Sequence, residues 1–211
     1  MIVFIADDHS SITWVVTHLV QEGLKGQPHQ AQAVSDVPSL LEGLDQARSV
    51  PCLVILDLSM PGELKRLALI REVQRRAPLA RVIVYSASDW PLMVEAALDL
   101  GIAGYVSKAG SMQSLLAAIR AAARGETYMD PSIRLHEAIN HPWKLLTPAE
   151  QEVVVALAKG QDLRSLASET GRAYQTVANH KYAAQQKLGV SGVIELSGYL
   201  MSHGLDFLLD G

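Results

Sequence analysis

The sequence predicts a doubly wound α/β domain on a five-stranded parallel sheet, followed by an all-α unit of four helices. Two observations carry this prediction. Short runs of apolar and β-branched residues alternate five times with helical patterns in residues 1–125, whereas residues 146–211 contain helical patterns only. Repeated strand–helix units join through right-handed crossovers, which produces parallel strands with helices on both faces.

The predicted strands are continuous apolar runs because parallel strands are buried on both faces. Between them, apolar residues recur at helical spacing, as in Ile12, Val15, Val16 and Leu19, which is typical of helices that bury one face. The strands are expected at residues 2–6, 29–35, 53–58, 81–88 and 103–107, and the second of these is the least apolar.

The pattern changes after Arg124. Residues 126–145 contain two prolines and mixed polarity, so we expect a linker there, with at most a short helix in its middle. Thr147 and Glu150 then form a capping-box pattern with Pro148 at the first helical position, and Gly160 is suited to the end of that helix. A separate helical domain is therefore expected over residues 146–211.

Composition narrows the class of protein. Hydrophobic residues make up 49% of the chain, and the net charge of −4 excludes nucleic-acid binding through overall positive charge. The single cysteine, Cys52, excludes a disulfide within the chain. The apolar start ends in two acids rather than a cleavage site, and no apolar run approaches the roughly 18 residues of a membrane span. We expect a cytoplasmic protein without a membrane partner.

Polar residues follow four of the predicted strands. Asp7 and Asp8 stand at the end of the first, Asp57 at the end of the third and Ser86 at the end of the fourth, and Lys108 comes just after the fifth. These side chains should converge, because ligands bind beyond the carboxyl ends of parallel strands. Crowded carboxylates need a proton or a cation, and oxygen ligands suit Mg²⁺. The set suits a phosphoryl group, which a carboxylate such as Asp57 can accept as a nucleophile.

On these residues and the phrases "DLSMPG", "YSAS" and "GYVSK", residues 1–125 resemble the flavodoxin-like receiver domain of bacterial two-component response regulators. The resemblance implies that Asp57 accepts the phosphoryl group from a sensor histidine kinase. It also implies that Asp8, Asp57 and the carbonyl oxygen of Ser59 bind Mg²⁺ directly, while Asp7 holds the metal through water. One departure is that the segment after Gly62 lacks the glycine that the family usually carries there.

The same resemblance assigns the remaining residues of the predicted site. It implies that Lys108 pairs with the phosphate, that Ser86 contacts a phosphate oxygen, and that Tyr105 is the aromatic residue that turns inward when Ser86 moves. His9 matches a common family residue, but Mg²⁺ prefers oxygen ligands, so His9 is not expected to bind the metal.

Residues 146–190 resemble the LuxR-type DNA-binding domain of NarL-type regulators, through "LTPAEQEVVVALAKG", "TVANH" and "KLGV". The recognition helix is expected over residues 174–188, with Val177, Ala184 and Leu188 facing the core. Asparagine and glutamine can pair with adenine, and alanine can contact a thymine methyl group. The expected DNA-contacting residues, all thought to face outward or to begin the helix, are Gln175, Thr176, Ala178, Asn179, Lys181, Tyr182 and Gln185.

This domain departs from the family in its charge. Ala178 stands where the family usually has a basic residue, and Arg172 and Ala173 stand where a capping residue is usual. From residue 144 onward there are six basic and seven acidic side chains. Few phosphate contacts predict weak binding by one copy, and a dimer would roughly double them. Val193, Leu196, Leu200 and Met201 of the last helix could serve a homodimer or ordinary core packing.

Together these features predict a DNA-binding transcription regulator, not an enzyme, that a histidine kinase phosphorylates on Asp57 and that dimerises in response. Three alternatives remain open. The protein could be an adaptor whose helical domain binds protein, or a regulator that works without phosphorylation. A dehalogenase-like phosphatase also uses an aspartate nucleophile, but it needs a second acid where Ser59 stands.

Overall fold

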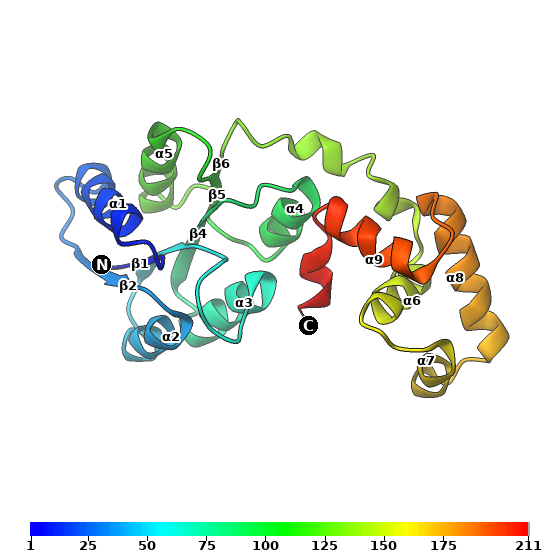
Figure 1. Ribbon diagram of the computed structural model, residues 1–211. Coiled ribbons are helices and arrows are strands. Elements are labelled where there is room, and N and C mark those ends of the chain that lie inside the picture. Colours follow the sequence, from blue (N-terminus) through cyan, green and yellow to red (C-terminus); the bar gives the residue numbers. More distant parts are fainter. Residues whose placement is uncertain (211) are drawn as a thin grey trace. The chain divides into compact units, whose positions relative to one another are not determined.

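The computed structural model describes residues 1–210 and divides into two compact units, Met1–Arg134 and Leu135–Gly211. The first contains a parallel sheet with helices on both faces, and the second is helical (Figure 1). Residues 126–134 belong to the first unit and residues 135–145 to the second, so the expected linker is shared between them. No helix within residues 1–210 has the length and apolar character needed to cross a membrane.

The sheet has six parallel strands in the order β2-β1-β3-β4-β5-β6. The prediction of five strands is therefore wrong by one. Tyr128 and Met129, which were assigned to the linker, pair with Gly104 and Tyr105, and a strand of two residues is too short to show any periodicity. The strands are β1 (Ile2–Ala6), β2 (Gln30–Val34), β3 (Cys52–Leu56), β4 (Ala80–Ser86), β5 (Gly104–Ser107) and β6 (Tyr128–Met129).

Five helices cover the sheet, with α1 and α5 together on one face and α2, α3 and α4 on the other (Figure 1). Val3 and Ile5 pack toward α1 and α5, whereas Phe4 lies beside Gly43 of α2. A Cβ atom at Gly43 would lie 2.7 Å from the Phe4 ring, so the glycine allows α2 to approach β1 closely. The helices are α1 (Ser10–Gly23), α2 (Val37–Gln46), α3 (Arg66–Arg76), α4 (Pro91–Asp99) and α5 (Met112–Ala123).

Residues 135–210 of the second unit contain the four predicted α-helices and three short 3₁₀ helices. The capping box is present: the Glu150 N–H donates to Thr147 Oγ1 at 3.3 Å, and the Thr147 N–H donates to Glu150 Oε2 at 2.7 Å. The elements are η1 (Leu135–Ala138), η2 (Pro142–Leu145), α6 (Pro148–Ala158), α7 (Leu163–Thr170), α8 (Tyr174–Leu188), α9 (Val193–Ser202) and η3 (Asp206–Leu209). Helix α8 thus has the bounds predicted for the recognition helix.

Glu150 also holds the second unit together. Its buried carboxylate lies 2.7 and 3.0 Å from Lys187 Nζ, so the start of α6 is bound to the last turn of α8. Burial raises the pKa of Glu150, but the hydrogen bonds from Lys187 and Thr147 outweigh burial and hold the pKa below its usual value. The carboxylate therefore stays charged at neutral pH.

His141 caps the short helix η2. Its Nδ1 accepts the N–H of Trp143 at 3.2 Å, and its ring meets the ring of His203 edge-on at 5.7 Å. Burial lowers the pKa of His141, and the smaller electrostatic effects of His203 and Lys144 act in the same direction. A protonated imidazole cannot accept the Trp143 N–H, so the folded unit favours neutral His141.

Acid should therefore destabilise the second unit through His141. Because the folded pKa is lowered, the contribution of His141 is complete above its unfolded pKa of about 6.5 and is lost as pH falls toward the folded value. We expect the urea midpoint to drop between pH 7.5 and 5.5, and to drop less in His141→Asn, whose amide oxygen caps the same N–H. Trp143 fluorescence in a Trp14→Phe, Trp90→Phe background reports this unit. Equal pH dependence with and without His141→Asn would contradict the assignment.

Candidate functional site

The sheet brings Asp7 and Asp57 side by side. Strands β1 and β3 are neighbours in register, with Ala6 opposite Leu56, and the N–H of Asp57 donates to the carbonyl of Ala6 at 2.8 Å. Each carboxylate therefore emerges at the same edge of the sheet, one residue beyond its strand. Both are buried, and Asp57 is only 2% exposed.

Lys108 joins these two carboxylates. Its Nζ lies 2.6 Å from Asp7 Oδ2 and 2.8 Å from Asp57 Oδ2. Burial lowers the pKa of Lys108, but the hydrogen bond to Asp57 and the contact with Asp7 outweigh burial and raise the pKa above its usual value. One ammonium group thus partly neutralises two buried carboxylates, and the site keeps a net negative charge.

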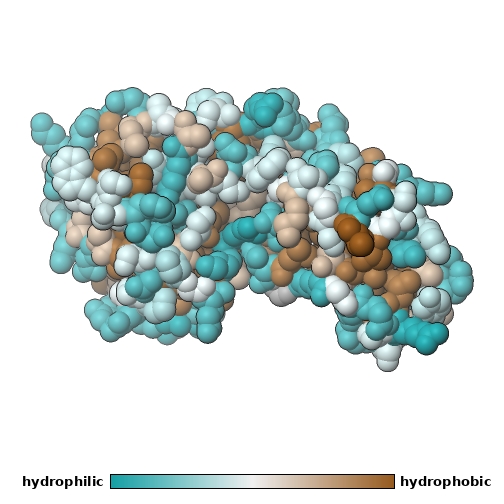
Figure 2. Space-filling view, viewed as in Figure 1, coloured by the Kyte–Doolittle hydropathy of each residue, from teal (hydrophilic) through white to brown (hydrophobic). Residues whose placement is uncertain are grey.

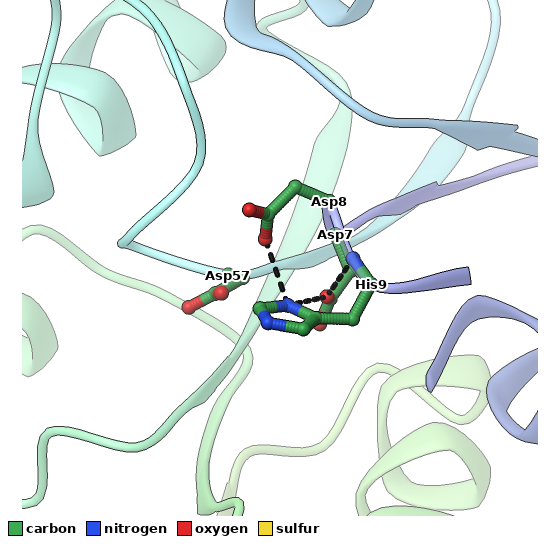
Figure 3. A group of neighbouring side chains, drawn as sticks. All are labelled: Asp7, Asp8, His9 and Asp57. Carbon is green, nitrogen blue, oxygen red and sulfur yellow. Dashed lines mark hydrogen bonds and ion pairs between the residues drawn. The ribbon is translucent and has the colours of Figure 1, made fainter. Parts of the chain in front are cut away.

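Asp8 and His9 complete the cluster on its solvent side (Figure 3). The imidazole Nδ1 of His9 lies 2.9 Å from Asp8 Oδ1 and 3.2 Å from Asp7 Oδ1, and the His9 N–H donates to Asp7 Oδ1 at 2.9 Å. One ligand atom from each of Asp7, Asp8, His9 and Asp57 lies within 4.8 Å of the others. The contacts of His9 with both acids were not foreseen from the sequence.

The donor set fits Mg²⁺. Three carboxylates supply hard oxygen ligands, and Asp7 Oδ2 is buried without a hydrogen bond of regular geometry, although it forms the ion pair with Lys108. Ser59 lies beside the cluster, where its N–H donates to Asp57 Oδ1 at 3.1 Å. The acidic pocket therefore has the negative charge and the oxygen atoms that suit a Mg²⁺ ion.

Ser86 and Tyr105 meet at the next loop along the sheet edge. Ser86 is buried at the end of β4, and its Oγ accepts the N–H of Ser88 at 3.2 Å. Tyr105 on β5 is buried too, and its hydroxyl donates to the carbonyl of Ser88. Burial raises the pKa of Tyr105, so this hydroxyl remains a neutral donor. Ser86 thus binds the N–H of Ser88, and Tyr105 binds its carbonyl oxygen.

In the second unit, α8 presents five of its seven expected DNA-contacting residues. Gln175, Thr176, Asn179 and Tyr182 are exposed and Lys181 is half-buried. The Gln175 amide donates to Asn179 Oδ1 at 3.2 Å, and Lys181 Nζ lies 4.2 Å from the centre of the Tyr182 ring. Gln175, Asn179 and Tyr182 lie on one face of the helix, because they are spaced by four and three residues. Together with Thr176 and Lys181, we call these residues the α8 stripe.

The other two expected residues do not face outward. Ala178 is 6% exposed and Gln185 is 7% exposed, so their assignment to the outer face is wrong. The two positions are seven residues apart and therefore lie on one face of the helix. Because α8 packs against α6, α7 and η2, its buried face extends beyond the predicted line of Val177, Ala184 and Leu188.

Comparisons with known proteins agree with both resemblances. Residues 3–120 match the response regulator receiver domain, and residues 144–199 match the luxR family of bacterial regulatory proteins. The chain is 32% identical to the transcriptional activator protein ExaE of Pseudomonas putida, over 96% of this chain and 97% of that protein. It is also 32% identical to the transcriptional regulatory protein RcsB of Escherichia coli K12, over 96% of this chain and 94% of RcsB.

Solved structures extend the likeness to the fold. The chain matches RcsB from Salmonella enterica serovar Typhimurium, bound to the promoter P1flhDC in the presence of the phosphomimetic BeF₃⁻, with a TM-score of 0.66 and 30% identity. That match covers 96% of this chain and 98% of the RcsB chain. From its two matched domains and its full-length relatives, the chain belongs to the response regulators that join a receiver domain to a LuxR-type DNA-binding domain.

Proposed function

We propose that Asp57 is the phosphoacceptor of this DNA-binding response regulator, and that phosphorylation controls its dimerisation and transcription. The observation that carries the proposal is the placement of Asp57. Its buried carboxylate lies at the carboxyl end of β3, beside an acidic metal pocket and bonded to Lys108. A sensor histidine kinase is the proposed phosphoryl donor, and the cytoplasm is the proposed location.

In the proposed step, a carboxylate oxygen of Asp57 attacks the phosphorus of a phosphohistidine. The new O–P bond forms as the P–N bond breaks, and the imidazole leaves with the electron pair and takes up a proton. Asp8, Asp57 and the carbonyl oxygen of Ser59 would hold Mg²⁺, with Asp7 acting through water. Bound Mg²⁺ neutralises charge on the phosphoryl oxygens.

Lys108 and Ser86 would then bind the new phosphoryl oxygens. Lys108 already contacts Asp57, so its Nζ can pass from the carboxylate to the phosphoryl group. If Ser86 Oγ turns toward the phosphoryl group, the Ser88 N–H loses its acceptor. Tyr105 is already fully buried, with its hydroxyl on the Ser88 carbonyl, so its ring lies inward while Ser86 is still bonded to Ser88. The proposed role of Tyr105 as the switching aromatic is then to keep hold of Ser88 when Ser86 moves.

A homodimer formed through α9 is supported by the apolar surface of that helix. Figure 2 shows hydrophobic side chains gathered over α9, where Ile194 is 89% exposed and Val193 and Met201 are also exposed. Leu196 and Leu200 are fully buried, so these two dimer candidates belong to the core instead. One relative, RcsB, is described as two dimers bound to two parallel DNAs, with a TM-score of 0.63 to this chain.

Acetyl phosphate with Mg²⁺ should phosphorylate the protein on Asp57. A phosphate-affinity gel should show a retarded band for wild type and for the control Asp99→Asn, an exposed aspartate outside the site. Asp57→Ala should remove the band, because it removes the proposed nucleophile, whereas Asp7, which is also buried and paired with Lys108, is proposed to serve the metal. A retarded band that persists in Asp57→Ala would overturn the assignment.

Mg²⁺ should stabilise the first unit through the acidic pocket. Free ligand at about tenfold above its Kd raises the free energy of unfolding by about 1.4 kcal/mol. We expect a Mg²⁺-dependent rise in the unfolding midpoint of wild type and none in Asp8→Asn, measured by circular dichroism. Asp99→Asn is again the matched control. An equal rise in Asp8→Asn would place the metal elsewhere.

The α8 stripe should carry the DNA contacts. Asn179→Ala should cost about 1–3 kcal/mol of binding free energy on a genomically selected promoter fragment and relax its sequence preference. Lys181→Ala should weaken binding on all sequences and reduce the salt slope by about one. Fluorescence anisotropy measures both, with the exposed Gln186→Ala as control. If no DNA fragment binds in either phosphorylation state, the better hypothesis is an adaptor whose helical domain binds protein.

A further inference from the structure

Asp130 is a buried carboxylate just after β6, in the segment that leaves the first unit. It is 1% exposed and accepts hydrogen bonds from three different parts of the chain. The donors are the N–H of Ser107 at 3.3 Å, the hydroxyl of Ser114 at 3.4 Å, and the N–H and hydroxyl of Ser132 at 2.9 and 2.8 Å. A buried carboxylate with this many donors is costly to release, because each lost partner leaves a buried polar group unsatisfied.

The bond to Ser107 places Asp130 next to the phosphorylation site. Ser107 directly precedes Lys108, whose own N–H donates to the carbonyl of Ser86 at 2.8 Å. The backbone at Lys108 is therefore held on one side by Ser86 and on the other by Asp130. Gly110 makes room for this contact, since a Cβ atom there would lie 2.7 Å from Asp130 Oδ2.

Strand β6 adds a second connection to the same region. The N–H of Asp130 donates to the carbonyl of Tyr105 at 3.0 Å, and Tyr128 donates to the carbonyl of Ala103 at 3.0 Å. Met129 pairs with Tyr105 in the sheet. The segment leading to the second unit is thus bonded to the backbone of the switching tyrosine and to the residue before the phosphate-binding lysine.

We infer that Asp130 is a positioning residue that couples the phosphorylation site to the chain segment leading to the DNA-binding unit. The inference rests on the proposed phosphorylation of Asp57. When Lys108 transfers its ammonium group from Asp57 and Asp7 to a phosphoryl group, its backbone displaces the Ser107 N–H. The hydrogen bond from Ser107 to Asp130 then either pulls Asp130 and Ser132 with it or breaks. The bonded and the broken arrangements are the two discrete states that coupling requires.

A role in the local turn alone would need only one of the two carboxylate oxygens of Asp130. Asp130 also starts a turn, in which the N–H of Ile133 donates to the Asp130 carbonyl at 3.1 Å and the N–H of Ser132 bonds to the side chain. A serine hydroxyl can accept the Ser132 N–H in the same way. Only the second carboxylate oxygen of aspartate reaches the Ser107 N–H, so Asp130→Ser separates the local role from the coupling role.

The test compares full-length wild type, Asp130→Ser and the local control Ser132→Ala. DNA affinity is measured with and without BeF₃⁻ and Mg²⁺, and uptake of phosphate from acetyl phosphate is read on a phosphate-affinity gel. We expect all three proteins to be phosphorylated and to bind DNA alike without BeF₃⁻. The gain in affinity on adding BeF₃⁻ should fall by about fivefold or more in Asp130→Ser only, which is the lower end of ordinary allosteric coupling.

The outcomes separate the two proposals. A full BeF₃⁻ gain in Asp130→Ser overturns the coupling role alone. If wild type takes up no phosphate and gains no DNA affinity on adding BeF₃⁻, the proposed function is overturned, and the inference falls with it. If Asp130→Ser fails to fold, hydrogen exchange of wild type decides: protection of residues 128–134 must change on adding BeF₃⁻, and unchanged protection overturns the inference.

Discussion

One ammonium group shared by two buried carboxylates is the interaction on which the first unit depends. Asp7 and Asp57 would repel each other at the ends of adjacent strands, and Lys108 offsets only one of the two charges. The remaining negative charge is what makes the pocket attractive to a divalent cation. A phosphoryl group on Asp57 would draw Lys108 away from both acids, so the proposed phosphorylation would rearrange the same ion pair that stabilises the site.

The parallel register extends this arrangement to the rest of the sheet edge. Neighbouring strands end level with one another, so the backbone of Lys108 lies against Ser86 and the hydroxyl of Tyr105 reaches Ser88. Strand β6 continues the series, because it pairs with the strand that carries Tyr105 and ends at Asp130. The loops around the acidic pocket are therefore joined to one another by a continuous set of backbone hydrogen bonds.

The second unit uses an ion pair for a different purpose. Glu150 completes the capping box of α6 and binds Lys187 at the end of α8, so the ion pair fixes α8 against α6. Because Lys187 is paired with Glu150, it is not available to contact a DNA phosphate. The near-neutral second unit has only five other basic side chains from residue 144 onward. An apolar outer face on α9 is consistent with a unit that gains affinity for DNA by pairing with a second copy.

The residues at the strand ends, the capping box and the bounds of α8 were all readable from the sequence. Each depends on the order of neighbouring residues, where apolar runs, caps and helical spacing leave a local signal. Strand β6, the Asp130 contacts, the Glu150–Lys187 pair and the burial of Ala178 depended on the tertiary structure. These features join residues far apart in the chain or need two helices to cover one face, so no local pattern records them. The sequence by itself determined which side chains stand at the strand ends and that they converge. Only the folded chain decided the partners of residues without such a signal, as in the bonds of Asp130 to Ser107 and of Glu150 to Lys187.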